Sequence, residues 1–215
     1  MRGRVGAGSV LLLAACGSPS AAPDAACHRQ VVYLDRAGGD YAPGAADDAT
    51  ANVSLLLDQP RTLPAWPYDD GNWAALTACI RTALAPFAVE VTEQDPGDAP
   101  HFELVFTTAY WAGVGGTTGI VPDSCRPGHQ VGFVFGAALP TYTRACQIAM
   151  IGFSEMAANL AMTTNCNDIL DNDMDCAPMR AFIDQEVACA GGACRCGGAT
   201  ENTYRALNAA LPACP

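Results

Sequence analysis

Apolar positions recur at helical spacing over Ile148–Asp168, which reads IAMIGFSEMAANLAMTTNCND. The four-residue spacing is kept by Ile148, Gly152, Met156 and Leu160. Small or apolar residues lie beside these positions, so the stretch has no polar face, and it predicts a buried central helix. We expect this helix to begin near Thr141 or Thr143 and to end in a polar turn that carries a cysteine.

Short apolar runs predict the strands of a sheet. Val31–Leu34 and Gln130–Phe135 are β-branched or apolar almost throughout, which is typical of buried strands. Two further strands are predicted at Phe87–Thr92 and Phe102–Thr108, because a turn sequence rich in aspartate, proline and glycine separates them. A glycine-rich stretch leads into a short edge strand at Thr117–Val121.

A first helix is predicted from Asn72 to Leu84, with Asn72 as its N-cap and Pro86 as the residue that stops it. Its apolar face would consist of Trp73, Leu76, Thr77, Ile80 and Leu84. Residues 36–71 are rich in glycine, proline and aspartate, so we expect a long loop there, with a helical turn at Ala46–Leu57.

The order of these elements predicts the fold class. It is strand, helix, strand, strand, short strand, strand and long helix, which indicates an α/β (α+β) fold. We expect a twisted mixed sheet of about five strands with two long helices. A disulfide-rich C-terminal segment would follow.

The first residues have the features of a targeting segment. Arg2 and Arg4 precede an apolar run that is too short to span a bilayer. The sequence Leu-Ala-Ala-Cys that ends at Cys16 resembles the lipobox of bacterial lipoproteins, in which the cysteine is lipidated; an ordinary secretory signal is the alternative. Residues 1–15 would then be a signal peptide and 16–27 a flexible tether, followed by subdomains at 28–164 and 165–215.

The cysteines indicate an oxidising compartment. An even number of cysteines behind an export signal predicts disulfides. Besides Cys16 there are ten: Cys27, Cys79, Cys125, Cys146, Cys166, Cys176, Cys189, Cys194, Cys196 and Cys214. Zinc binding by Cys189, Cys194 and Cys196 is the rival interpretation, but their spacing matches no common zinc pairing.

Charge excludes some partners. The formal charge is −11, and it becomes −13 once the two arginines of residues 1–15 are removed. An acidic chain without a basic cluster is a poor candidate for binding nucleic acid or anionic lipid surfaces. We therefore expect contact with a membrane only through lipid on Cys16, at the bacterial cell envelope, facing the periplasm or the exterior.

The central stretch also holds a candidate motif around Glu155. When Glu155 is aligned with the glutamate of H-E-x-x-H-x-x-G-x-x-H, the histidine positions fall on Ser154, Ala158 and Thr164, and the glycine falls on Ala161. The chain thus resembles the metzincin zinc peptidases with every zinc ligand replaced.

The resemblance covers roughly residues 28–207. The segment Asn165–Leu170 resembles the descent to the Met-turn, whose methionine would fall near Leu170, with Met174 as a weaker candidate. The run from Cys176 to Ala206 is similar to the cysteine-rich tail of secreted bacterial members.

The resemblance implies a metzincin-like fold that has lost its catalytic zinc. We expect no metal, no cofactor and no catalytic residue, hence a pseudoenzyme. Such a fold can still hold an extended peptide or protein along an edge strand, here Thr117–Val121, by main-chain hydrogen bonds. The alternative is an active hydrolase or metallopeptidase with a non-standard arrangement around Glu155. The acidic loop at Asp171, Asp173 and Asp175 is expected to be solvated, with calcium binding as its alternative.

Overall fold

The computed structural model describes residues 29–109, 118–119, 130–136, 139, 141–171, 173, 176 and 180–211. The expected signal peptide, the lipidation site Cys16 and the tether lie outside these residues. So do Cys27, Cys125, Met174, Asp175 and Cys214. None of the described helices is long and apolar enough to cross a membrane.

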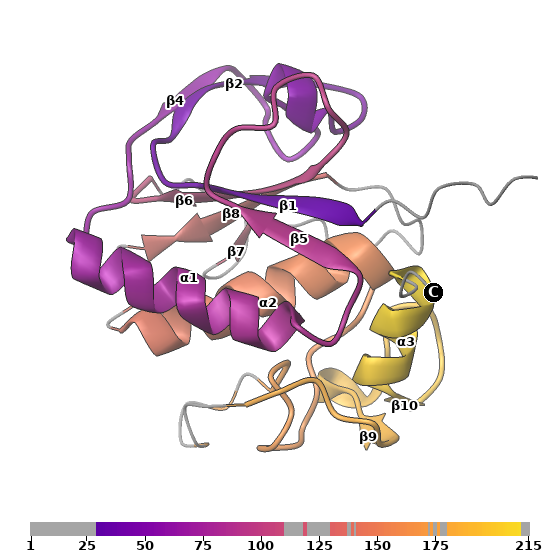
Figure 1. The fold of residues 1–215 in the computed structure, drawn as a ribbon. Helices are drawn as coiled ribbons and strands as arrows, with labels where there is room; N and C mark the ends of the chain where they lie inside the picture. Colours follow the sequence, from indigo (N-terminus) through magenta and orange to yellow (C-terminus); the bar gives the residue numbers. More distant parts are fainter. Residues whose placement is uncertain are drawn as a thin grey trace, which may run out of the picture.

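A five-stranded mixed sheet forms the centre of the molecule, in the order β5-β1-β6-β8-β7 (Figure 1). Its strands are β1 (Gln30–Asp35), β5 (Val89–Thr92), β6 (Phe102–Thr107), β7 (Thr118–Gly119) and β8 (Val131–Phe135). Neighbouring strands run parallel except at β7, which pairs antiparallel with β8 at the edge. The predicted mixed α/β character is thus confirmed, since apolar strands buried on both faces suit a parallel sheet.

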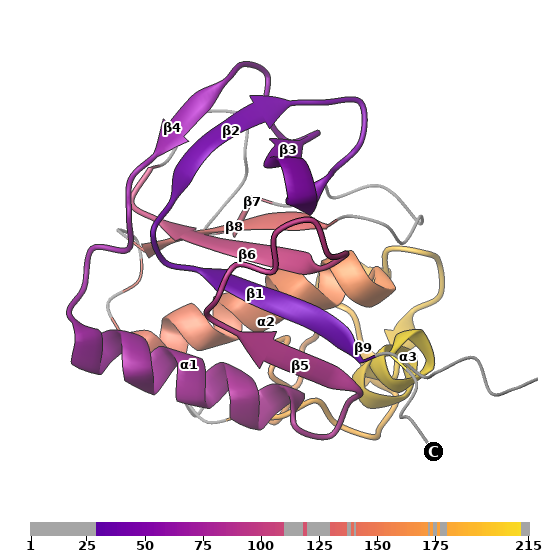
Figure 2. The ribbon, with the colours of Figure 1, turned by 45° about the horizontal axis from the view of Figure 1, so that its top comes forward.

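Two helices cover one face of this sheet, α1 (Asp70–Leu84) and α2 (Tyr142–Ala158) (Figure 2). The predicted apolar face of α1 is buried at all five positions. The predicted N-cap is wrong, because the side chain of Asp69 accepts a hydrogen bond from the backbone N–H of Asn72 at 2.7 Å. Asn72 therefore lies in the first turn, three residues after the cap.

Helix α2 begins after Thr141, whose hydroxyl caps its first turn. Every residue from Ala145 to Ala157 is buried, as the absence of a polar face predicts. The helix ends at Ala158, and Asn159 follows in the left-handed conformation with φ 54°. The predicted helix continues further, to a polar turn that carries Cys166, so its predicted end is wrong.

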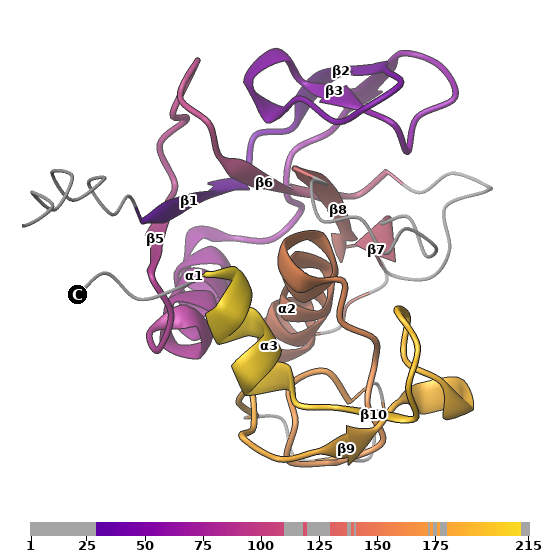
Figure 3. The same ribbon diagram turned by 90° about the vertical axis from the view of Figure 1, so that its right-hand side faces the viewer.

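The other face of the central sheet is covered by residues 39–63, which form short strands where a long loop was predicted, although the predicted helical turn within Ala46–Leu57 is present at Ala49–Ala51. They form a small sheet in the order β3-β2-β4, which we call the cap sheet (Figure 3). Its strands are β2 (Gly39–Pro43), β3 (Val53–Ser54) and β4 (Arg61–Leu63), with a 3-10 turn at Ala49–Ala51. Tyr41 and Leu63 of the cap sheet pack with Val105 and Phe133 of the central sheet.

The C-terminal segment, from residue 165 to the end of the described residues at 211, packs beside α2 and has little regular structure. It contains the hairpin of β9 (Val187–Ala188) and β10 (Thr200–Glu201), then α3 (Thr203–Ala210), with a 3-10 turn at Ala190–Gly192. Leu207 of α3 is buried in the same core as α1 and α2.

The prediction of disulfides is confirmed for six cysteines. Cys79 of α1 is bonded to Cys146 of α2, and the other two bonds are Cys166–Cys176 and Cys189–Cys194. The last two lie in the C-terminal segment, where cross-links replace the apolar packing that short elements cannot provide.

Candidate functional site

Glu155 lies in the last turn of α2 and is nearly inaccessible, with 6% of its surface exposed. Its carboxylate forms an ion pair with the guanidinium of Arg195, which comes from the C-terminal segment 40 residues later. The Arg195 side chain is itself 20% exposed. The one acid that the motif alignment retains is therefore covered and neutralised by a cation of the same chain.

Burial dominates the ionisation of Glu155. It raises the pKa of this carboxyl to about 7, while the charge and hydrogen bond of Arg195 act in the opposite direction. An isolated carboxylate at this depth would be strongly destabilising, because a charge removed from water needs a partner. Arg195 supplies that partner.

A second carboxylate, that of Glu201 in β10, holds the chain just beyond α2. Its Oε1 accepts a hydrogen bond from the backbone N–H of Ala161 at 3.0 Å. Burial raises the pKa of Glu201 to about 7; the Ala161 N–H and Arg195 favour its ionised form, and Asp168 opposes it.

Asp168 is completely buried close to Glu201. The hydroxyl of Thr203 donates to Oδ2 at 2.9 Å, and the backbone N–H of Leu170 donates to Oδ1 at 3.0 Å. Burial raises the pKa of Asp168 to about 6, although both hydrogen bonds favour the anion. We call Glu155, Asp168, Arg195 and Glu201 the helix-end cluster. Its ion pair and hydrogen bonds connect the C-terminal segment to the end of α2.

The remaining motif positions do not offer metal ligands. Ser154 is fully buried, and its hydroxyl donates to the carbonyl of Ile151 in the same helix at 2.9 Å. Ala158 is half-buried. Thr164 is exposed, and its hydroxyl donates to the carbonyl of Ala188 at 3.3 Å. The two hydroxyls are thus directed at separate backbone carbonyls.

Within the described part of the chain, three potential ligand side chains come together in two places. One group is Cys166, Asp171 and Cys176; the other is Cys189, Cys194 and Glu201. Each contains a disulfide, whose sulfurs carry no thiolate to bind zinc. The rival zinc set of Cys189, Cys194 and Cys196 is unsupported for the same reason.

The acidic loop is not simply solvated. Asp171 is buried, and its Oδ1 accepts a hydrogen bond from the backbone N–H of Asp173 at 2.7 Å. Arg180 lies 3.9 Å from the same carboxylate and donates to the carbonyl of Asp173. The expectation of a solvated face is therefore wrong at Asp171, because an arginine of the C-terminal segment folds over it.

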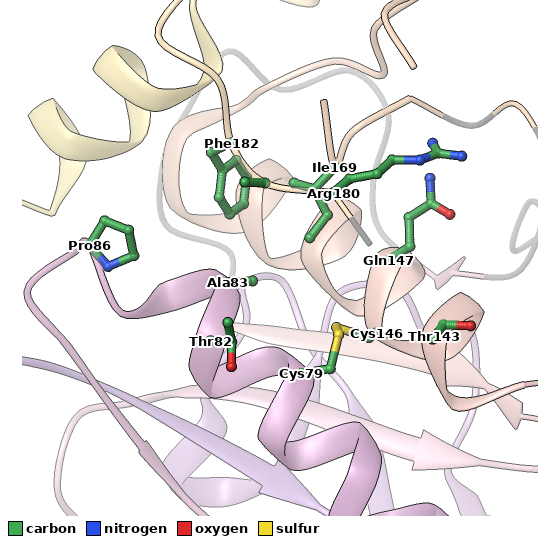
Figure 4. A pocket seen from close by; sticks show the side chains of 11 residues that line it. Cys79, Thr82, Ala83, Pro86, Thr143, Cys146, Gln147, Ile169, Arg180 and Phe182 are labelled. Atoms are coloured by element: carbon green, nitrogen blue, oxygen red, sulfur yellow. A yellow bond between two sulfur atoms is a disulfide. The ribbon is translucent and has the colours of Figure 1, made fainter. Parts of the chain in front are cut away.

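A pocket of about 90 Å³ lies between α1, α2 and residues 180–182 (Figure 4). The Cys79–Cys146 disulfide lines it, together with Ile169 and Phe182 on the apolar side. Gln147 and Arg180 form its polar end. Gln147 is eight residues before Glu155, about 12 Å along α2, so this pocket is separate from the helix-end cluster.

The predicted edge strand is described at Thr118 and Gly119, which pair with Val134 and Phe133 at the margin of the central sheet. The rest of Thr117–Val121 lies outside the described residues. Among the described residues, β7 is the last strand on its side of the central sheet, so its outer edge pairs with no other described strand.

Sequence reasoning singled out Glu155 but missed Arg195 and Glu201. Arg195 stands between two cysteines in CRCGG, and nothing in that local pattern indicates a partner 40 residues away. No protein family, curated protein or solved structure matches this chain. The metzincin resemblance therefore depends on the residues of this chain alone.

Proposed function

We propose that this chain is an exported, lipid-anchored pseudo-peptidase with a metzincin-like fold, which binds extended peptide segments at the cell envelope. The observation that carries the proposal is the ion pair of Glu155 and Arg195. In a metzincin the corresponding glutamate accepts a proton from zinc-bound water. Here the carboxylate faces a guanidinium in a buried site.

The side chains at the ligand positions support the same conclusion. The zinc site of the metzincin motif needs three imidazoles that converge on one point. Ser154 and Thr164 instead donate to the carbonyls of Ile151 and Ala188, and Ala158 has no donor atom. Without zinc, water keeps its ordinary, very high pKa instead of one near neutrality, so Glu155 has no nucleophile to activate.

Peptide binding is supported by the sheet margin at β7. A strand that adds to an edge forms main-chain hydrogen bonds, which need neither metal nor catalytic groups. Thr118 and Gly119 pair inward with β8. In an antiparallel ladder, alternate residues direct their N–H groups toward and away from the partner, so one of these two offers its N–H outward.

The experiment compares peptides that differ only in backbone chemistry. Binding of an extended peptide library to the oxidised protein is measured first, and the best binder is then N-methylated at alternate residues. We expect one methylation register to abolish binding and the other to preserve it. Thr118→Pro and Gly119→Pro provide the reciprocal test, because the proline at the outward position removes one donor without breaking the β7–β8 ladder.

Catalysis is tested on the same preparation. We expect no stoichiometric zinc and no cleavage of casein, with or without chelator. Chelator-sensitive cleavage would overturn the pseudo-peptidase proposal and establish the active hydrolase instead. Equal binding of all N-methylated peptides would refute the edge-strand site.

A further inference from the structure

Two acids face each other from neighbouring strands beneath the cap sheet. Asp35 ends β1 and Glu103 lies in β6, where Tyr33 pairs with Glu103 and Asp35 with Val105. Residues that alternate along a strand share a face, so Asp35 and Glu103 lie on the same side of the sheet. Tyr41 reaches them from β2 of the cap sheet. The exposed fractions of Asp35, Tyr41 and Glu103 are 3%, 2% and 2%.

The hydrogen-bond geometry requires a shared proton. The hydroxyl oxygen of Tyr41 lies 3.0 Å from Oδ2 of Asp35 and 2.8 Å from Oε1 of Glu103. A phenol has one proton, so it can donate to one carboxylate at a time. If both acids were ionised, the second contact would bring two oxygens together without a proton. One of the two carboxyls must therefore be protonated.

The surroundings indicate which acid holds that proton. Oδ1 of Asp35 accepts hydrogen bonds from the backbone N–H groups of Ala37 and Gly38, at 2.8 and 3.1 Å. Oε2 of Glu103 is buried without a hydrogen-bond partner. The negative charge is thus stabilised on Asp35. Glu103 donates to the oxygen of Tyr41, which in turn donates to Asp35.

The groups that surround Glu103 do not favour its ionisation. Burial has the largest effect on the pKa of Glu103 and raises it. The charges of Asp35 in β1 and Asp95 in the loop before β6 raise it as well, and the resulting pKa is about 8. Only a hydrogen bond donated by Tyr41 would favour the anion of Glu103, and Tyr41 has a single proton, which it donates to Asp35. His101 packs edge-on against Tyr33, with its ring nitrogen 2.7 Å from the carbonyl of Ala99.

We propose that Asp35, Tyr41 and Glu103 form a proton-dependent latch, which holds the cap sheet closed on the central sheet and gives up one proton when the cap opens. Tyr41 packs edge-on against Phe133, and Thr107 of β6 donates to the carbonyl of Pro64 at 2.7 Å. These contacts couple the latch to the apolar layer under the cap. Once water enters, Glu103 regains its ordinary acidity and ionises.

The sign of the pH effect follows from this proton release. The closed state binds the proton up to a pKa of about 8, while the open state holds it only below the ordinary value of 4.5. The opening constant therefore increases about tenfold for each pH unit between pH 4.5 and about 8, and it does not change with pH below or above this range. The latch is closed most firmly in acid.

The test is amide hydrogen exchange of the full oxidised protein at pH 5.5 and 7.5, corrected for intrinsic rates. For amides of residues 39–63 we expect the opening constant to rise about 100-fold across this interval, since one proton is released over two pH units. Glu103→Gln should abolish the increase. Glu90→Gln, an exposed substitution on β5, should retain it.

Tyr41→Phe provides a second variant, because it removes the bridging hydroxyl and leaves both acids. We expect opening to increase at least about tenfold at both pH values, from the loss of a charge-assisted hydrogen bond. The proposal is overturned if the wild-type opening constant does not change with pH, or if the increase persists in Glu103→Gln. It is also overturned if cap amides exchange only together with those of β8, since opening would then be global unfolding. If Glu103→Gln does not fold, the pH response of the wild type, Glu90→Gln and Tyr41→Phe decides.

Discussion

Replacement of Arg195 by alanine should destabilise the protein by an amount that depends on pH. The guanidinium is the charged partner of Glu155, whose side chain is 7% exposed. Arg195→Ala leaves this acid buried without a counter-charge. Removal of one partner of a buried pair typically costs about 3–5 kcal/mol when the remaining group stays charged. Glu155 can bind a proton instead, and pH 8 is only about one unit above its folded pKa of about 7, which limits the cost of losing the charge of Arg195 there to about 1.4 kcal/mol.

The pH dependence can be worked out from the ionisation of Glu155. Its pKa is about 7 in the folded protein, against an ordinary value of 4.5. Because the folded pKa is raised, Glu155 lowers stability progressively between about pH 4.5 and 7, by about 3 kcal/mol in total at 1.36 kcal/mol per unit. Without Arg195 the folded pKa rises further, so the loss continues to higher pH. At pH 5 Glu155 is protonated when folded, and the substitution should cost less than about 1 kcal/mol.

The assay is denaturant unfolding of the oxidised protein at pH 5 and pH 8. Glu155→Gln should suppress most of the effect of Arg195→Ala in the double variant, and Glu201→Gln measures the part due to the other neighbouring acid. Arg205→Ala, which removes an exposed pair with Asp184, is the matched control and should have little effect at either pH. A cost for Arg195→Ala below about 1 kcal/mol at pH 8, or equal at both pH values, would refute the argument.

Three further outcomes are expected. Replacement of Cys79 and Cys146 by alanine opens a link across 67 residues and should lower the free energy of unfolding by about 4 kcal/mol, measured by denaturant titration; a change below about 1 kcal/mol would contradict this. Asp69→Ala should cost about 1 kcal/mol through loss of the N-cap of α1, whereas Asn72→Ala should cost clearly less, and the reverse order would restore Asn72 as the cap. Cys16→Ser should release the protein from membranes in fractionation; unchanged membrane association, with no lipid mass on the native chain, would exclude lipidation.

The sequence predicted those elements whose pattern is complete within a short window. The strands β1, β6 and β8 are mostly apolar and buried, and the apolar face of α1 recurs at helical spacing, so local periodicity was sufficient. The cap sheet was missed because its strands are two to five residues long and because β2 begins with glycine and ends with proline. Asp69, Asp70 and Asn72 compete as caps within four positions, which pattern alone cannot resolve.

The candidate site shows the same limit more sharply. Glu155 is identifiable because an acid in an apolar helix is conspicuous. Its partner Arg195 is 40 residues away, and Tyr41 is 62 residues from Glu103. Such pairs arise from the three-dimensional path of the chain and have no local spacing that could reveal them.

The parallel sheet also determines the order in which the chain can fold during synthesis. Strand β1 is made first, yet both of its neighbours come later: Gln30 pairs with Val89, and Asp35 with Val105. No hairpin can protect β1 in the meantime, so a nascent chain that stops before β6 carries an apolar strand with an open edge. We expect such unfinished chains to aggregate or to require a chaperone, whereas chains complete through α2 can close the sheet and cover it.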